Sequence, residues 1–183
     1  MNELDILYSK EGFTFVKNSK NNYSLTFQME NKSIIISKII DFSLIKLIYD
    51  LNSDIYEKVY FQKIDENQAT MNMLMKHLFE DLGLPQRFSY LHMIKHVDEN
   101  KITFTSQSIY SERPEGMPKN AEQMLIKNMI CECNIVTLHR VDFSCNVIFE
   151  DYMLVPQFAE KMVGLILFKI FSRVKQFIEN VKI

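Results

Sequence analysis

Several features that define common protein classes are scarce or absent in this chain. Its 183 residues include four glycines and no tryptophan, and neither a Gly-x-Gly-x-x-Gly pattern nor a Walker pattern occurs. Loops that cradle phosphate groups need such glycines because the backbone must approach the phosphate closely. The sequence therefore argues against nucleotide binding through a glycine-rich loop.

Long apolar runs are absent as well. No stretch reaches the roughly 18 to 20 apolar residues that cross a bilayer, and residues 1–5 lack the basic start and apolar stretch of a signal peptide. The three cysteines, Cys131, Cys133 and Cys145, are an odd number, so we expect no disulfide framework. These observations predict an intracellular, cytoplasmic protein.

Excess charge of either sign is also missing. The formal net charge is −2, the isoelectric point is near 6.1, and lysines and arginines are interspersed with acidic residues. Binding to a polyanion needs a basic stripe, so we expect no nucleic-acid partner. With 47% hydrophobic residues, residues 1–183 can form one globular domain, in which residues 1–31 are either the first strands or an N-terminal extension.

The first third of the chain predicts strands followed by short helices. Two apolar segments, residues 13–17 and 23–29, flank a polar stretch and predict a hairpin, and residues 34–36 continue the strand pattern. Asp41 can cap a helix whose apolar residues recur at helical spacing. Asn52-Ser53-Asp54 either ends this helix or starts a second short turn over residues 55–59.

From residue 70 the apolar residues follow a period of two. Residues 70–78 predict a strand, although their Met and Leu content also suits a helix. Two further runs, residues 87–97 and 101–110, are joined by Asp98-Glu99-Asn100 and predict an antiparallel pair. Residues 120–127 are compatible with a short helix or with the start of the next strand.

The last third of the chain carries the clearest pattern. Residues 129–138 and 142–150 alternate as a hairpin, with Cys131 and Cys133 on the same side as Phe143 and Cys145. Residues 156–181 predict a long helix that is apolar nearly all round between residues 162 and 171. Such a helix must contact protein, ligand or membrane on more than one face.

This order of elements indicates an α+β protein, and it resembles the START and Bet v 1-like helix-grip superfamily of lipid and hydrophobic-ligand binders. The stretch Leu84-Pro85-Gln86-Arg87-Phe88-Ser89-Tyr90 is similar to a family stretch in which a proline, an arginine and an aromatic strand follow the early helices. Residues 102–108, the loop prolines Pro114 and Pro118, and the closing helix are similar in order and spacing. The resemblance covers roughly residues 34–181.

The resemblance implies a curved antiparallel sheet wrapped around a long C-terminal helix, with two short helices after the first strands and a tunnel between sheet and helix. The chain departs from the family pattern in having no tryptophan, no acidic residue at Phe88 and no glycine-rich loop. We therefore expect a lipid or another hydrophobic small molecule as ligand and no cofactor, with lipid transfer or sensing as the role, and we leave the ligand class open.

Candidate ligand contacts come from the strands and from the terminal helix. Flexible, polarisable methionines suit an adaptable cavity, although they equally fill an ordinary core. Three groups of candidates follow. The middle strands provide Met71, Met73, Met75 and Phe104, and possible head-group contacts are Arg87, His92 and His96, with Tyr90 as a further candidate on the same strand. The hairpin provides Cys131, Cys133, Phe143 and Cys145. The terminal helix provides Phe158, Met162, Leu165 and Phe168.

The helix stripe of Phe158 and Leu165 could face the ligand while a second stripe, with Val163 and Ile170, packs on the sheet, or the reverse. Lysines beside the helix could also favour transient contact with anionic lipid. If the core is filled, whichever stripe packs on the sheet, we expect the same fold to act as a protein-interaction module instead.

Two chemical alternatives remain open at this point. Cys131, Cys133, Cys145 and His139 supply four soft metal ligands within fifteen residues, although structural zinc more often uses Cys-x₂-Cys. A cysteine paired with His139 could act as a nucleophile if its pKa were depressed. A small cyclase or hydrolase is therefore a third functional class, although no constellation of residues recommends it, and we expect a binding protein rather than an enzyme.

Overall fold

The computed structural model describes residues 5–110, 113–153 and 155–182. They form one sheet of ten strands in the order β1-β2-β3-β10-β9-β7-β6-β5-β4, and the short β8 pairs with β6 outside this path. All neighbours are antiparallel except β8 and β6. The strands are β1 (Asp5–Lys10), β2 (Phe13–Ser19), β3 (Asn22–Glu30), β4 (Tyr56–Lys63), β5 (Gln68–Met75), β6 (Arg87–Asp98), β7 (Lys101–Ser108), β8 (Glu122–Gln123), β9 (Ile126–Thr137) and β10 (Arg140–Phe149).

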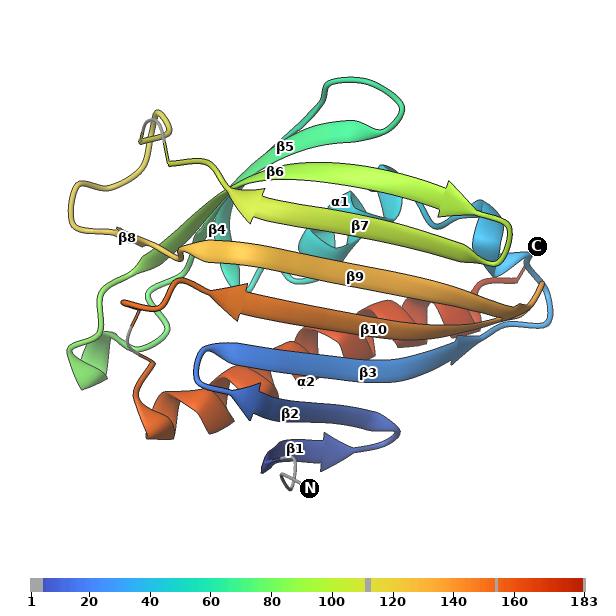
Figure 1. Ribbon diagram of the computed structural model, residues 1–183, viewed down its shortest axis with the longest axis horizontal. Helices are drawn as coiled ribbons and strands as arrows, with labels where there is room; N and C mark the ends of the chain where they lie inside the picture. The colour runs from blue at the N-terminus through green and yellow to red at the C-terminus, as the bar shows by residue number, and fades with distance from the viewer. Residues whose placement is uncertain (1–4, 111–112, 154, 183) are drawn as a thin grey trace.

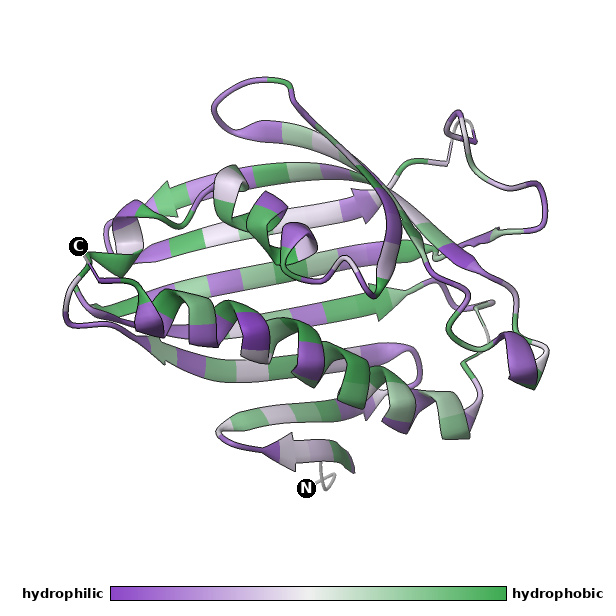
Figure 2. Cartoon of the chain, turned by 180° about the vertical axis from the view of Figure 1, so that it is seen from behind, coloured by the Kyte–Doolittle hydropathy of each residue, from purple (hydrophilic) through white to green (hydrophobic). Residues whose placement is uncertain are grey.

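Two α-helices and two 3-10 turns complete the fold. They are η1 (Ile36–Lys38), α1 (Phe42–Asp50), η2 (Glu80–Leu82) and the long α2 (Gln157–Asn180). Figure 1 views the sheet with both α-helices behind it, and Figure 2 shows the same helices from the other side, lying across one face of the sheet. This arrangement confirms the α+β helix-grip prediction.

The N-terminal strands belong to the sheet. Residues 13–19 and 22–30 pair as the predicted hairpin, and β3 then pairs along its length with β10. Phe13, Phe15, Leu25 and Phe27 are almost completely buried, because alternate residues of both strands point toward α2. Strand β1, which the sequence pattern did not predict, adds an outer edge to this hairpin.

Two local predictions were wrong. Residues 34–36 do not continue a strand but lead into η1, because the Asn31 side chain accepts a hydrogen bond from Ser33 N and turns the chain. Ile34 and Ile36 are then buried in the core. Of the two alternatives for residues 52–54, the end of the helix is correct, and the second short turn over residues 55–59 is wrong. Residues 56–59 instead begin β4, an edge strand whose partly exposed pattern obscures the period of two.

The remaining predictions from periodicity are confirmed. Asp41 caps α1 by accepting a hydrogen bond from Ser43 N at 2.6 Å. Residues 70–75 lie in β5, and β6 with β7 forms the predicted antiparallel pair. Of the two possibilities for residues 120–127, the structure contains the short strand β8 and the start of β9.

Helix α2 approaches the first strands closely at Gly164. A Cβ atom placed on this glycine would lie 2.9 Å from Cδ1 of Phe15 and 3.1 Å from Cβ of Tyr8. Ala159, Ile170 and Val174 share this buried side of the helix. The stripe predicted from Ile170 and Val174 is therefore the one that packs on the sheet, and glycine is required where the helix passes β1 and β2.

We predict that Gly164→Val destabilises the protein by about 1 to 3 kcal/mol, the usual cost of overpacking a tight contact. Chemical denaturation monitored by circular dichroism measures the effect. Leu165→Val is the matched control, since it introduces the same β-branched residue at the adjacent, half-exposed position. Equal stability of the two variants would show that the helix is not held close to β1 and β2.

Candidate ligand-binding site

The sheet has two chemically different faces. The inner face, which lies under the helices, carries apolar side chains, while the outer face carries mostly polar ones. Cys131 lies directly opposite Cys145 and beside Phe104, and Cys133 lies opposite Phe143. The structure therefore brings these five predicted candidates together in one patch of the inner face.

The methionine candidates lie on the same face but in a different environment. Met71 and Met73 are buried, and strand alternation places the half-buried Met75 beside them. Above β7, Phe42 of α1 packs on Phe104 with ring centroids 5.7 Å apart. This side of the inner face packs against α1.

The predicted head-group contacts do not meet this patch. Leu91 and Met93 of β6 point into the core, so Tyr90 and His92 point to the outer face. There the His92 ring nitrogen Nε2 lies 3.2 Å from Gln68 Oε1. Arg87 instead pairs with Glu122 of β8 at 2.7 Å.

The four candidates on α2 do not lie on one side of the helix. Phe168 faces the sheet, with its ring centroid 5.3 Å from that of Phe13, and Met162 is half-buried. Phe158 and Leu165, by contrast, are 51% and 52% exposed on the opposite side of the helix. The stripe of predicted contacts is therefore split between the interior and the surface.

The central strands are incompletely covered. Helix α2 contacts β1 and β3, its Phe171 packs on Phe143 of β10 with ring centroids 5.4 Å apart, and α1 contacts β4. The two helices therefore lie over different halves of one face of the sheet, and they also contact each other. Between them, inner-face residues of β9 and β10 keep surface that a water-sized sphere can touch: Met129, Cys131, Phe143, Cys145, Val147 and Phe149. Such exposure is unusual for apolar side chains in the middle of a sheet that helices cover.

Two tyrosines that the sequence analysis did not select complete this region. Tyr49 of α1 and Tyr56 of β4 have ring centroids 4.8 Å apart in a T-shaped arrangement. Burial raises the pKa of both hydroxyls well above the ordinary value, and the neighbouring Tyr56, Cys131 and Cys145 raise that of Tyr49 further. The sequence signal for Tyr49 was its place in the apolar stripe of α1.

Two cysteines of the patch, Cys131 and Cys133, have raised pKa values. The pKa of Cys131 is raised well above its usual value by the hydrogen bond with Cys145, whose sulfur is 2.9 Å away, and by burial. Burial also raises the pKa of Cys133 to about 12. A nucleophilic cysteine needs a depressed pKa, so these thiols behave as small apolar residues.

The zinc alternative is not supported within the described parts of the chain. No three potential ligands among these residues are grouped to hold a metal ion. The Nδ1 atom of His139 lies 2.7 Å from the carbonyl oxygen of Ile34, and this contact holds the histidine at the β9–β10 turn. The histidine therefore serves the chain connection rather than the thiols.

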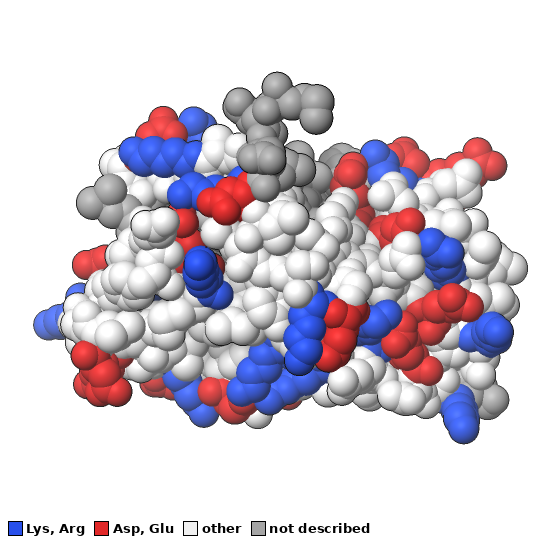
Figure 3. Space-filling view, turned by 90° about the horizontal axis from the view of Figure 1, so that it is seen from below, with Lys and Arg blue, Asp and Glu red and all other residues white. Residues whose placement is uncertain are grey.

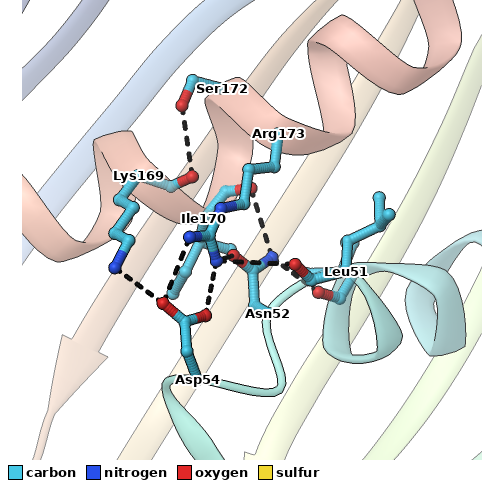
Figure 4. Close-up of polar contacts among 8 residues, drawn as sticks. Leu51, Asn52, Asp54, Lys169, Ile170, Ser172 and Arg173 are labelled. Carbon is cyan, nitrogen blue, oxygen red and sulfur yellow. Dashed lines mark hydrogen bonds and ion pairs between the residues drawn. The ribbon is translucent and has the colours of Figure 1, made fainter.

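An ionic clasp joins α1 to α2 beside the uncovered region. Asp54, in the turn after α1, accepts hydrogen bonds from Arg173 at 2.5 Å and from Lys169 at 2.7 Å. Asn52 is completely buried there and donates to the backbone oxygens of Ile48 and Ile170 (Figure 4). This clasp fixes the distance between the two helices that flank the site.

A second polar contact holds the start of α2. Glu160 is 4% exposed and accepts hydrogen bonds from Tyr23 at 2.6 Å and Lys17 at 2.7 Å. A buried carboxylate needs such partners to offset its desolvation. The helix is thus tied at its first turn to β2 and β3 and at its middle to the turn after α1.

Two hollows lie outside the inner face. A cleft of about 850 Å³ is bordered by Arg87, Lys119 and Tyr152, and a groove of about 430 Å³ on the outer face is bordered by Tyr60, Asn72 and Tyr90, among other residues. Lysines, arginines and acidic residues occur together across the surface in Figure 3. Neither hollow connects the apolar candidates described above.

We predict that Cys131 and Cys133 react slowly with iodoacetamide at pH 8 in the folded protein, at least about tenfold more slowly than in guanidinium chloride, because only a thiolate is alkylated and raised pKa values keep these two groups protonated. Peptide mass spectrometry follows each cysteine separately. Either of these two cysteines reacting equally fast in both states would contradict the picture of an apolar thiol patch.

We predict that Asp54→Asn lowers stability at pH 7 by about 1 kcal/mol, as expected for an ion pair that is partly exposed. Arg173 and Lys169 hold the pKa of Asp54 well below its usual range. The stabilisation is therefore present above about pH 4 and disappears as the pH falls further. Thermal unfolding of wild type and variant between pH 2 and pH 7 should show their difference shrinking in acid.

Asp151→Asn is the control for this experiment, because Asp151 is exposed and makes no ion pair among the described residues. A difference between wild type and Asp54→Asn that stays constant down to pH 2 would rule out the charge of Asp54 as its cause.

Comparisons with known proteins identify the fold. No protein-family model matches the chain, and a search of curated proteins found no match in sequence. Among solved structures, human StAR-related lipid transfer protein 5 is similar with a TM-score of 0.69 at 10% identity, over 97% of this chain and 87% of that one. A STAR-related lipid transfer protein fragment from Xanthomonas axonopodis is similar with a TM-score of 0.68 at 10% identity, over 97% of this chain and 99% of that one.

A third structure is more distant. The di-domain ARO/CYC protein BexL of the BE-7585A biosynthetic pathway is similar with a TM-score of 0.50 at 6% identity, over 91% of this chain and 52% of that one. The chain therefore has the helix-grip fold of START domains, as the resemblance predicted. In the described structure, neither α1 nor α2 combines the length and hydrophobicity needed to cross a membrane.

Proposed function

We propose that this protein binds a lipid or another hydrophobic small molecule in the space between the central strands and the two helices. The observation that carries the proposal is the partial exposure of the inner-face residues of β9 and β10. The two helices above them lie over different halves of the same face of the sheet. A ligand that covers apolar side chains in this position removes their surface from water, which favours the bound state. The START-domain fold supports the same function.

The energetics favour a ligand with an extended apolar part. Each buried CH₂ group contributes about 0.8 kcal/mol, so a sixteen-carbon ligand gains roughly 13 kcal/mol before the costs of association. These costs are about 4 to 15 kcal/mol. The balance is compatible with reversible binding, which transfer or sensing of a lipid inside the cell requires.

Binding is better supported than catalysis. The similarity to an ARO/CYC protein shows that a helix-grip fold can belong to a protein of that kind. In this chain, however, the tyrosines and thiols beside the uncovered strands have raised pKa values. Protonated groups of this kind suit recognition, whereas a general base must be deprotonated near neutral pH.

Exchange of a lipid with a membrane has a suitable surface at the start of α2. Phe158 and Leu165 are one stripe of exposed apolar residues on this helix, Lys161 lies between them, and the 69% exposed Tyr152 precedes the helix. Apolar side chains beside a lysine suit shallow contact with anionic lipid. We include transient membrane contact in the proposed function.

We predict that Val147→Trp abolishes lipid uptake while the protein remains folded, because a large side chain occupies the uncovered space. Ile148→Trp is the matched control, since the adjacent residue of β10 points to the outer face. Native mass spectrometry of the purified proteins, followed by extraction and identification of bound lipid, measures uptake. Thermal unfolding checks that both variants fold.

A lipid-sized adduct on wild type and on Ile148→Trp, but not on Val147→Trp, is the expected result. The core is filled if two results occur together: the Val147→Trp protein is unfolded, and wild type carries no lipid and takes up none when lipid is added. In that case the fold serves as a protein-interaction module.

A further inference from the structure

Two of the three cysteines are in direct contact with each other. The sulfur atoms of Cys131 and Cys145 lie 2.9 Å apart, and Cys131 donates a hydrogen bond to Cys145. The two residues pair directly across β9 and β10. Both are half-buried, in the row of the inner face that also contains Phe104 and Leu25. The sheet itself therefore holds these two thiols together.

The pairing of the strands suits a disulfide bond. Residues directly opposite each other on antiparallel strands have Cα atoms about 4.5 or 5.5 Å apart, and disulfides join Cα atoms about 4.4 to 6.8 Å apart. An S–S bond is about 2.05 Å long. The two sulfurs at 2.9 Å therefore need to approach by less than about 1 Å to form one. Rotation of the two side chains can supply this movement without a change in strand register.

The third cysteine does not share this geometry. Cys133 lies opposite Phe143, in the next row of the same face. Its diagonal distance to Cys145 is about 7 to 8 Å. Cys131 is two residues away on the same strand, about 6.6 Å, with its side chain parallel to that of Cys133. Of the three possible pairings, only that of Cys131 with Cys145 brings two sulfurs into contact.

We propose that Cys131 and Cys145 form a reversible oxidation site, at which hydrogen peroxide converts the two thiols into one disulfide. One thiol loses its proton, and its sulfur attacks a peroxide oxygen. The O–O bond breaks, which leaves a sulfenic acid and a hydroxide ion. The second sulfur then attacks the first, and the S–OH bond breaks to release a second hydroxide. The two hydroxides take up the two thiol protons as water, and two electrons pass from the sulfurs to the peroxide.

The two steps differ in speed. Attack on peroxide needs a thiolate, so the raised pKa of Cys131 slows this step as it slows alkylation. The second step joins groups that are already in contact, and such reactions have effective concentrations of about 10⁵ M or more. The sulfenic acid is therefore consumed before further peroxide can oxidise it to an irreversible sulfinic acid.

The disulfide would link the two central strands in the middle of the inner face. It would close a ring through the β9–β10 turn, and a thiol reductant would open the ring again by exchange. This inference depends only on the strand pairing and the two sulfurs. It holds whether or not the inner face binds a lipid.

The test treats the reduced full chain with hydrogen peroxide and blocks remaining thiols with N-ethylmaleimide in denaturant. Digestion with trypsin and with a protease that cleaves after glutamate separates Cys131 from Cys133 at Glu132, and mass spectrometry without reduction identifies the linked peptides. We expect the link between Cys131 and Cys145 to be at least about tenfold more abundant than both other pairings together, because only this pair has disulfide geometry. Dithiothreitol should remove it.

Two variants and one condition are the controls. Cys133→Ala should form the link as wild type does, whereas Cys145→Ala should form none, and circular dichroism checks that both variants fold. Wild type treated in guanidinium chloride should give a mixture of pairings, because the sheet no longer selects one.

Three results with folded wild type would overturn the proposal. The first is that both thiols stay free under peroxide that links the unfolded chain. The second is that one of them becomes a sulfinic acid without forming a link. The third is that Cys133 is linked as often as its neighbours.

Discussion

The close contact between α2 and the first strands determines the rest of the architecture. Because Gly164 has no side chain, the helix lies directly against Phe15 and Tyr8, and Glu160 fixes its first turn to β2 and β3. Further along the helix, Phe171 packs on Phe27 of β3 and on Phe143 of β10, with ring centroids 5.4 Å apart in both pairs. The anchors at Gly164 and Glu160 thus set how far α2 reaches across the sheet.

The polar contacts of the inner side are distributed unevenly. Charged groups occur at the two places where α2 is attached, in the contacts of Glu160 and Asp54. Between these anchors lie the tyrosines Tyr49 and Tyr56 and the thiols of the patch, and Lys95 lies over the ring of Phe42. Charges paired with each other stabilise a defined helix position, while the stretch between them keeps a surface that an apolar molecule can cover at little cost.

Periodicity in the sequence was enough to predict much of this fold. The hairpin of β9 and β10, the faces of its cysteines and the long helix follow from spacing alone, because central strands and an amphipathic helix carry strong patterns. The edge strands β1 and β4 were missed, since their residues are partly exposed on both faces. A strand pattern also does not reveal which of its faces the helices cover.

This ambiguity explains why some candidate residues lie away from the inner face and why others were missed. Tyr90 and His92 alternate with Leu91 and Met93, and only the tertiary structure shows that the aliphatic pair faces the helices. Tyr49 and Tyr56 lie on different elements and meet through the turn after α1. Likewise, the sequence alone did not divide the stripe of α2 into the buried Phe168 side and the exposed Phe158 side, because that division depends on the angle at which the helix lies.

The pairing of β3 with β10 also has a consequence for how the protein forms. On the side away from β2, residues 22–30 pair with residues 140–148, so one side of the N-terminal hairpin stays unpaired until most of the chain has been synthesised. Pairing between such distant segments closes a long loop and slows folding. During synthesis the free edge of β3 is therefore the segment most in need of protection by a chaperone.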